Sequence, residues 1–242
     1  MAYNDDYGNE SSTAVAGEVL TLDRDGHVTQ WDMMTAQAVR SEIITDPDHQ
    51  MTPPHVKWDP HHSYAVAVTA GTQVHLLDWR ADASIPTGTC SSFTAHRYGV
   101  TDVDFNPNKP HVMATAGQDG LLKFWDLRNS KRPLLTARGG HSHYAWTVQY
   151  NPFHDQLMVS TGTDSVVNLW RVSTISSAPL LTVNDDEGSA NPNVRVSRYE
   201  HGDSVYGMAW GASDAWIYAT VGYDGKVVLN HVPSKEKYKI LL

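Results

Sequence analysis

The sequence contains a single cysteine, Cys90, which excludes an internal disulfide and a zinc site built on several cysteines. Long apolar runs are also missing: the stretch 64–70 is far shorter than the roughly 20 residues of a membrane-spanning helix, and the N-terminus has no apolar signal core. Basic residues are few, with 18 Lys and Arg against 27 Asp and Glu. We therefore expect a soluble, non-secreted chain, without membrane insertion and without nucleic acid as a partner.

Four segments repeat one pattern in a chain whose 242 residues, 40% of them hydrophobic, are enough for one sizeable core. Each has an apolar, β-branched run, a turn, and a second alternating run, with the turn Asp six positions before a Trp or its equivalent. The segments are 19–32, 112–126, 157–170 and 217–230. Asp-Gly occupies the turn in three of the four copies, as expected where a two-residue loop needs positive φ. Each copy therefore predicts a β-hairpin.

Histidines mark the same period upstream of the hairpins. His96, His141 and His201 each precede an apolar strand residue by seven positions, and the same offset points to His49. The spacings of 47, 45 and 60 residues are similar to the roughly 40 to 45 residues of a WD40 repeat, apart from one insertion. The insertion is predicted at about 183–195, an acidic and Asn-rich stretch without periodicity that is typical of a solvated loop.

The repeated residues resemble the structural tetrad of WD40 repeats: a His, a hydroxyl four residues before the turn Asp, that Asp, and a Trp in the following strand. Two copies are complete, with His96, Thr115, Asp119 and Trp125 in the third and His141, Ser160, Asp164 and Trp170 in the fourth. The last copy keeps His201, Thr220 and Asp224 but has Asn230 for Trp, and the second has Leu77 for Trp and Gly71 for Asp. These groups can satisfy one another's hydrogen bonds in series, so the resemblance implies a structural role. We expect the two incomplete copies to be less rigidly tied.

This resemblance implies an all-β fold, a WD40 β-propeller with about four full blades and one partial blade over residues 16–242. The fuller blades are predicted at about 49–90, 96–137, 141–182 and 201–242. The first blade ends near Trp31 and lacks its inner strand, because residues 1–15 form a polar N-terminal segment. A propeller must close to hide its edge strands, so we expect an N-terminally shortened part of a seven-bladed protein. A closed five-bladed ring is the alternative.

Some of these residues also have the types found in reactive sites. Ser160, His141 and Asp164 match a hydrolase triad, but no nucleophile elbow is present and the repeat spacing accounts for them. The thirteen histidines, notably the pairs His141/His143 and His61/His62, suggest a metal site, yet three or four of them belong to tetrads and adjacent histidines on a strand point apart. The acidic stretch 185–188 lacks the alternating ligands of a calcium loop. We therefore predict no enzyme activity, no metal or cofactor, and no small-molecule substrate.

Several stretches resemble one WD40 family in particular, the EARP- and GARP-interacting WD-repeat family. They are 104–110, 123–129, 141–143, 150–157, 173–177, 200–206, 223–228 and 238–242. The resemblance covers nearly the whole chain from about residue 17. It implies a cytosolic adaptor that associates peripherally with tethering-complex subunits at endosomes and the trans-Golgi network, and assists recycling and retrograde vesicle traffic.

Three aromatic residues are candidates for partner binding. Tyr144, Trp146 and Tyr206 follow the tetrad histidines by three or five positions, where propeller loops lead into the inner strands. Exposed aromatic side chains are common anchors at protein interfaces. The alternative, that they pack between neighbouring blades, remains open at this stage.

A second function is suggested by the segment Trp125-Asp126-Leu127-Arg128, which resembles the WDxR box of substrate receptors for cullin-4 ubiquitin ligases. Arg80 takes the matching position in the preceding copy. Arg128 would offer its forked donors to the cullin-4 ligase adaptor. The alternative is a surface Arg paired with a nearby carboxylate, and we favour the tethering-complex adaptor over the ligase receptor.

Overall fold

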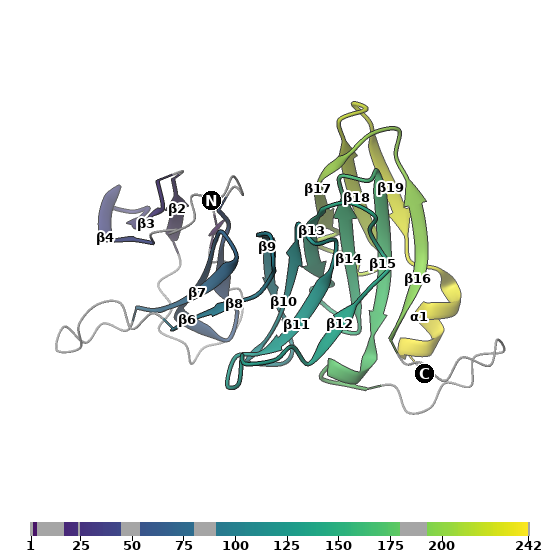
Figure 1. Ribbon diagram of the computed structural model, residues 1–242, viewed down its shortest axis with the longest axis horizontal. Helices are drawn as coiled ribbons and strands as arrows, with labels where there is room; N and C mark the ends of the chain where they lie inside the picture. Colours follow the sequence, from purple (N-terminus) through teal and green to yellow (C-terminus); the bar gives the residue numbers. More distant parts are fainter. Residues whose placement is uncertain are drawn as a thin grey trace. The chain divides into compact units, whose positions relative to one another are not determined.

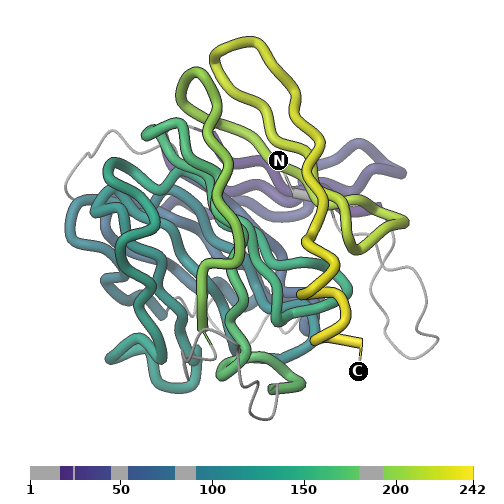
Figure 2. The backbone as a smooth tube through the Cα atoms, turned by 90° about the vertical axis from the view of Figure 1, so that its right-hand side faces the viewer, coloured from purple at the N-terminus to yellow at the C-terminus, as the bar shows by residue number. Residues whose placement is uncertain are grey.

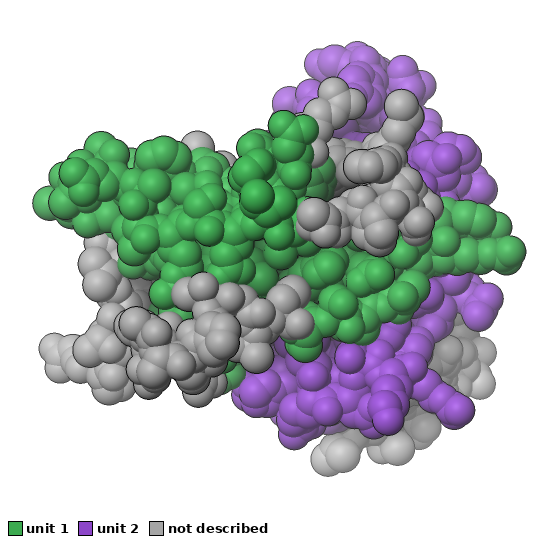
Figure 3. Space-filling model, turned by 60° about the vertical axis from the view of Figure 1, so that its left-hand side comes forward, with its two compact units in different colours: residues 1–103 green, residues 104–242 purple. Residues whose placement is uncertain are grey.

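The predicted hairpins form part of five antiparallel sheets in the described part of the computed structural model (Figure 1). The structure describes residues 2–3, 17–23, 25–44, 54–79, 91–179 and 193–241. These fall into two compact units, residues 1–103 and 104–242, which Figure 3 colours separately. The prediction of an all-β fold is confirmed.

The first unit contains two four-stranded sheets in which consecutive strands are neighbours. One consists of β1 (Ala2–Tyr3), β2 (Glu18–Leu22), β3 (His27–Asp32) and β4 (Gln37–Ile43). The other consists of β5 (Val56–Asp59), β6 (His62–Ala70), β7 (Gln73–Asp78) and β8 (Ser91–Thr94). Leu20 and Val28 of the first sheet belong to one buried cluster with Trp58, Val66 and Leu77 of the second, and this cluster is the core of the unit.

The first sheet has an inner strand that the sequence did not predict. β1 pairs antiparallel with Val19 and Leu20 of β2. Strand pairing is made by backbone groups and does not require apolar side chains. A strand of two residues can therefore form within a segment whose overall composition is polar. The prediction of a missing inner strand is therefore wrong at residues 2–3, whereas residues 4–15 lie outside the described part of the chain.

The remaining strands form three sheets, again with consecutive strands as neighbours. The third sheet consists of β9 (Val100–Phe105), which contains the boundary between the units, β10 (Val112–Gly117), β11 (Leu122–Asp126) and β12 (Leu135–Ala137). The fourth consists of β13 (Ala145–Tyr150), β14 (Leu157–Gly162), β15 (Val166–Val172) and β16 (Asn193–Glu200), with a 3-10 turn at Ser173–Ile175. The fifth consists of β17 (Val205–Trp210), β18 (Ile217–Gly222) and β19 (Val227–His231).

The outer strand of the fourth sheet lies beyond the predicted end of its blade at residue 182. β16 pairs with β15 from Val166–Glu200 to Val172–Asn193, so the insertion falls between the third and fourth strands of one sheet. Residues 183–192 lie outside the described part of the chain, and 193–195 belong to β16. The sequence of β16 is polar, as is usual for an edge strand, and its partner strand β15 lies on the other side of the insertion. The sequence pattern therefore placed the first residues of β16 in the predicted loop.

The hairpin turns have the backbone geometry that their sequences predict. Gly26, Gly120 and Gly225 adopt φ of +85°, +70° and +72°. Ser165 takes the same place in the fourth copy with φ of +65°. Glycine adopts this left-handed region without a steric penalty, which explains the Asp-Gly pairs.

The fifth sheet has three strands followed by a helix, whereas a complete blade was predicted for residues 201–242. Figure 2 follows the yellow end of the chain from β19 into α1 (Ser234–Leu241). The Pro233 carbonyl accepts hydrogen bonds from the N–H groups of Glu236 and Lys237, and proline favours the first turn of a helix. Glu236 near the start and Lys239 near the end complement the helix dipole. Residues 234–241 therefore favour a helix over a fourth strand.

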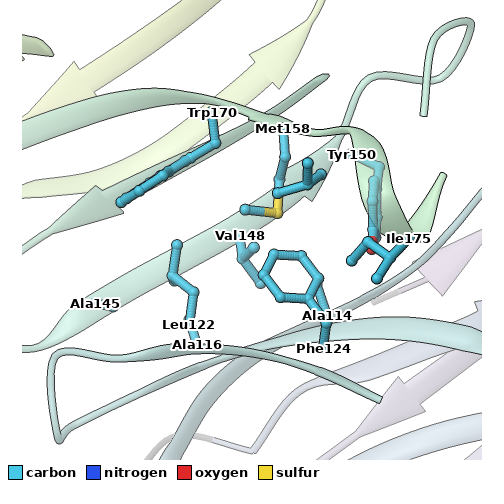
Figure 4. Close-up of a cluster of buried hydrophobic side chains, with 11 residues drawn as sticks. Ala114, Ala116, Leu122, Phe124, Ala145, Val148, Tyr150, Met158, Trp170 and Ile175 are labelled. Atoms are coloured by element: carbon cyan, nitrogen blue, oxygen red, sulfur yellow. The ribbon is translucent and has the colours of Figure 1, made fainter. Parts of the chain in front are cut away.

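Neighbouring sheets of the second unit are joined by apolar side chains. Phe124 of β11 points toward Val148 and Tyr150 of β13 and Met158 of β14 in one buried cluster (Figure 4). A second cluster joins the fourth sheet to the fifth. Its buried members are Leu157, Val159, Val167, Leu169, Val205, Tyr218 and Val232. The fourth sheet thus buries apolar side chains against both of its neighbours, as an inner blade of a propeller does.

Candidate functional site

The fourth tetrad is complete and fully connected. Trp170 Nε1 donates to Ser160 Oγ at 2.8 Å, and Ser160 Oγ lies 2.8 Å from His141 Nε2. His141 Nδ1 lies 3.0 Å from Asp164 Oδ1, and the backbone N–H of Ser142 donates to Asp164 Oδ2 at 2.8 Å. One proton arrangement satisfies every group: the indole donates to the serine, the serine to the imidazole, and the imidazole to the carboxylate. The tetrad therefore ties β14 and β15 to the loop before β13.

The electrostatics of this tetrad favour an ionised Asp164. Burial by itself raises the pKa of the Asp164 carboxyl, but the hydrogen bonds from His141 and the Ser142 N–H outweigh it and lower the pKa from 3.8 to about 2. A carboxyl whose pKa is lower in the folded state stabilises the fold above its unfolded pKa. That stabilisation is lost as the pH falls through the folded value.

We predict that Asp164 contributes about 1 to 2 kcal/mol to the free energy of unfolding at neutral pH, after allowance for solvent screening. The contribution is expected to fall between about pH 4 and pH 2, because the folded and unfolded forms titrate at the two ends of that window. Urea unfolding of the wild type and Asp164→Asn across this range measures it. A difference between the two proteins that does not shrink toward pH 2 would contradict the assignment.

The third tetrad shows the same bond between its indole and hydroxyl. Trp125 Nε1 donates to Thr115 Oγ1 at 2.9 Å, and Asp119 Oδ1 accepts the backbone N–H of Leu121 at 3.2 Å. His96 is buried and belongs to the first unit. The first copy repeats the bond between Trp31 and Thr21 at 2.8 Å. The predicted His49 lies outside the described residues.

The last copy keeps the tetrad in a weaker form. His201 Nε2 lies 2.9 Å from Thr220 Oγ1, but Asn230 Nδ2 reaches the same oxygen only at 3.5 Å. His201 Nδ1 is 3.5 Å from Asp224 Oδ1 and forms no hydrogen bond there. Burial raises the pKa of the Asp224 carboxyl, but backbone N–H groups and His201 lower it more, so the net direction is downward. All three distances, from the hydroxyl to the imidazole, from the hydroxyl to residue 230 and from the imidazole to the carboxylate, are longer than their equivalents in the fourth tetrad.

The hydroxyl of the fourth tetrad is engaged within the tetrad. Ser160 is fully buried and already bonded to both the indole and the imidazole, so its hydroxyl has no access to a substrate. Within the described residues, no group of three or more His, Cys, Asp or Glu side chains is arranged to hold a metal ion. In the same part of the chain, the structure contains no helix with the length and apolarity needed to cross a membrane.

The aromatic candidates lie at related positions of the fourth and fifth sheets. Trp146 and Tyr206 each occupy a register shift near the start of an inner strand, in β13 and β17. Tyr206 is exposed, whereas Tyr144 and Trp146 are half-buried. The structure adds Tyr223, whose ring centroid lies 4.7 Å from that of Tyr206 and which is 71% exposed. Its place directly before the turn residue Asp224 was the signal that sequence reasoning missed.

Hydrogen bonds link the loops and turns that carry these aromatic residues. Thr163 donates its N–H to the Tyr144 carbonyl at 3.0 Å, and Ser204 Oγ donates to the Thr163 carbonyl at 2.9 Å. Tyr223 in turn donates its N–H to the Ser204 carbonyl at 2.9 Å. We call Tyr144, Tyr206 and Tyr223 the tyrosine surface. Its members come from the fourth and fifth sheets, and aromatic residues are enriched at protein interfaces.

The WDxR segment has a different environment from the one that ligase binding predicts. Arg128 donates from Nε and Nη2 to the two oxygens of Asp126 at 2.9 and 2.6 Å. The Arg128 hydrogen bond lowers the pKa of Asp126, and Asp126 raises that of Arg128. Trp125 is buried, with its Nε1 bonded to Thr115 Oγ1, so little of its indole is exposed. Arg80 lies outside the described residues.

Comparison with known proteins gives the family. Residues 50–170 match the family described as EIPR1 beta-propeller, and residues 193–229 match the WD domain, G-beta repeat. The second match combines β16 of one sheet with β17, β18 and most of β19 of the next, so the sequence repeat is offset from the structural blade by one strand.

Curated relatives agree with this match. The chain is 37% identical to EARP and GARP complex-interacting protein 1 of Rattus norvegicus over 93% of this chain and 61% of the relative. It is 38% identical to the Homo sapiens protein of the same name over 90% of this chain and 60% of the relative, and 34% identical to EARP-interacting protein 1 of Caenorhabditis elegans over 76% and 52%. The chain thus spans about 60% of the length of the rat and human relatives. These matches and the five WD40-type sheets show that the chain belongs to the EIPR1 β-propeller family, the WD40-repeat family of the EARP and GARP complex-interacting proteins.

Proposed function

We propose that this protein is a non-enzymatic adaptor that binds subunits of the EARP and GARP tethering complexes and assists endosomal recycling and retrograde vesicle traffic. The observation that carries the proposal is its similarity to the rat and human EARP and GARP complex-interacting proteins, which are 37% and 38% identical to it over 93% and 90% of this chain. On this proposal the protein acts in the cytoplasm, peripherally associated with endosomes and the trans-Golgi network.

The tyrosine surface supports this proposal as the docking site. Tyrosine supplies a large, rigid contact area with a polar tip, and is enriched among the residues that carry most of the binding energy at interfaces. The Tyr144 ring also contacts the His143 ring, with centroids 4.1 Å apart and planes tilted by 31°, and this contact restricts its motion before a partner arrives. The half-buried Trp146 lies two residues further along the same chain segment.

We predict that Tyr144→Ala and Trp146→Ala each weaken binding to purified EARP or GARP complex about 10-fold, the effect of a moderate interface anchor. The measurement is biolayer interferometry with the immobilised chain, and an N-terminally extended version alongside. The melting temperatures of both variants are expected to stay near the wild-type value. Equal loss of binding and of melting temperature would show that these residues only stabilise the fold.

A second candidate function is a substrate receptor of a cullin-4 ubiquitin ligase, favoured by the exposure of Arg128 at 67%. Two of its donor groups already hold Asp126, so the ligase would have to use the remaining donors or replace that pair. Arg128→Ala distinguishes the two functions. It abolishes binding of the ligase adaptor if the second function holds, and leaves EARP and GARP binding unchanged if the first does.

A further inference from the structure

The most exposed part of the tyrosine surface is a pair of tyrosine rings. Tyr206 is 44% exposed and Tyr223 is 71% exposed, and their planes meet at 47°. The two residues come from β17 and from the β18–β19 turn. A pair of tilted rings presents two π faces to solvent at one place. Such faces attract a cation through their quadrupoles.

The loop before β17, which is hydrogen-bonded to the turn that carries Tyr223, also contains an exposed carboxylate. Gly202 donates its N–H to Asp224, the residue after Tyr223, and Ser204 accepts the N–H of Tyr223. Asp203 lies between these two anchor points and is exposed. Its Oδ1 accepts the N–H of Ser204 at 2.6 Å, and no ion pair involves Asp203 within the part of the chain that the structure describes.

The nearby cation does not neutralise Asp203. Lys226 Nζ lies 4.0 Å from Asp224 Oδ2, so its charge is directed to a different carboxylate. The chain as a whole carries a net charge of −9, which attracts basic partners over longer distances. Two π faces and an unpaired carboxylate are complementary to a cationic side chain. They offer little to an acidic one.

We propose that Tyr206, Tyr223 and Asp203 bind an arginine or lysine side chain of the tethering-complex partner. This inference rests on the proposed function and names the chemistry of its contact. The cation lies against the two rings and pairs with the Asp203 carboxylate, while Tyr144 contributes to the contact on the neighbouring sheet. Because the ring pair and the carboxylate recognise one charge together, their contributions are not additive.

The test measures the affinity of the purified full chain for purified EARP and GARP complexes. Tyr206→Leu and Tyr223→Leu keep apolar area but remove the π face, and each is expected to weaken binding about fivefold. Tyr223→Phe keeps the face and binds like the wild type. Asp203→Asn weakens binding about fivefold at low salt and has little effect in about 0.5 M salt, where exposed charges are screened.

Two matched controls lie elsewhere in the same unit. Tyr238→Leu changes a tyrosine of α1 that is 64% exposed, and Asp214→Asn changes an exposed carboxylate that accepts the N–H of Trp216. Both are expected to bind like the wild type. Circular dichroism melting of every variant separates lost binding from lost folding.

Each remaining outcome overturns a named statement. Leu variants that bind like the wild type exclude the ring pair from the contact. Leu variants that weaken binding while Asp203→Asn has no effect at any salt concentration indicate an apolar partner and overturn the cationic one. A folded wild type that binds neither complex overturns the proposed function itself, and this inference with it.

Discussion

Replacing Ser160 with alanine is expected to lower the free energy of unfolding by about 3 kcal/mol. The substitution removes one oxygen, which leaves Trp170 Nε1 without its acceptor at 2.8 Å and leaves His141 Nε2 with only its 3.3 Å contact to Asn168 Nδ2. An unsatisfied buried group costs more than a hydrogen bond contributes, because its lost contact with water is not replaced. Urea unfolding followed by tryptophan fluorescence measures the change.

A second serine and the weaker tetrad serve as controls for this result. Ser142→Ala removes an exposed hydroxyl 3.4 Å from Asp164 Oδ2 and is expected to change stability by less than about 0.5 kcal/mol. Thr220→Ala is expected to cost less than Ser160→Ala, because Asn230 reaches the Thr220 hydroxyl only at 3.5 Å. If Ser160→Ala is as mild as Ser142→Ala, the tetrad does not stabilise this fold.

The second large effect is expected at the helix that ends the chain. Glu236→Ala should destabilise the protein by about 3 kcal/mol, because it removes the Glu236 carboxylate from the buried Arg171 guanidinium. Arg171 Nη1 donates to Glu236 Oε2 at 2.8 Å, and both residues are almost fully buried. The pair connects β15 of the fourth sheet to α1. Thermal and urea unfolding of the variant measure the loss.

An exposed ion pair of the same chemistry provides the control. Arg198 and Glu200 lie 2.7 Å apart, but both side chains are well exposed. Glu200→Ala is expected to cost less than about 1 kcal/mol, because water replaces the lost partner. The double variant Arg171→Met with Glu236→Leu should recover most of the stability lost in Glu236→Ala. A similar cost for the Glu236 and Glu200 variants would show that burial does not strengthen the role of the first pair.

Local features of this protein were determined by its sequence alone. The hairpins and the pairs that cross them join residues close in the chain, such as Thr115 and Trp125, which are 10 positions apart. The turn residue, the alternation of the strands and the tetrad spacing all act over such distances, so periodicity predicts them directly. The fold class and the indole–hydroxyl bonds of the third and fourth copies follow from these local signals.

Other features were decided only by the tertiary structure, because they depend on contacts between distant segments. β16 joins its sheet across the insertion, and polar edge strands have little periodicity of their own. Arg171 and Glu236 are 65 positions apart, and neither residue signals that it will be buried. Tyr223 joins Tyr206 because the loop before β17 bonds to the β18–β19 turn. Sequence patterns report what each segment favours by itself, whereas burial and pairing are set by what the other segments place beside it.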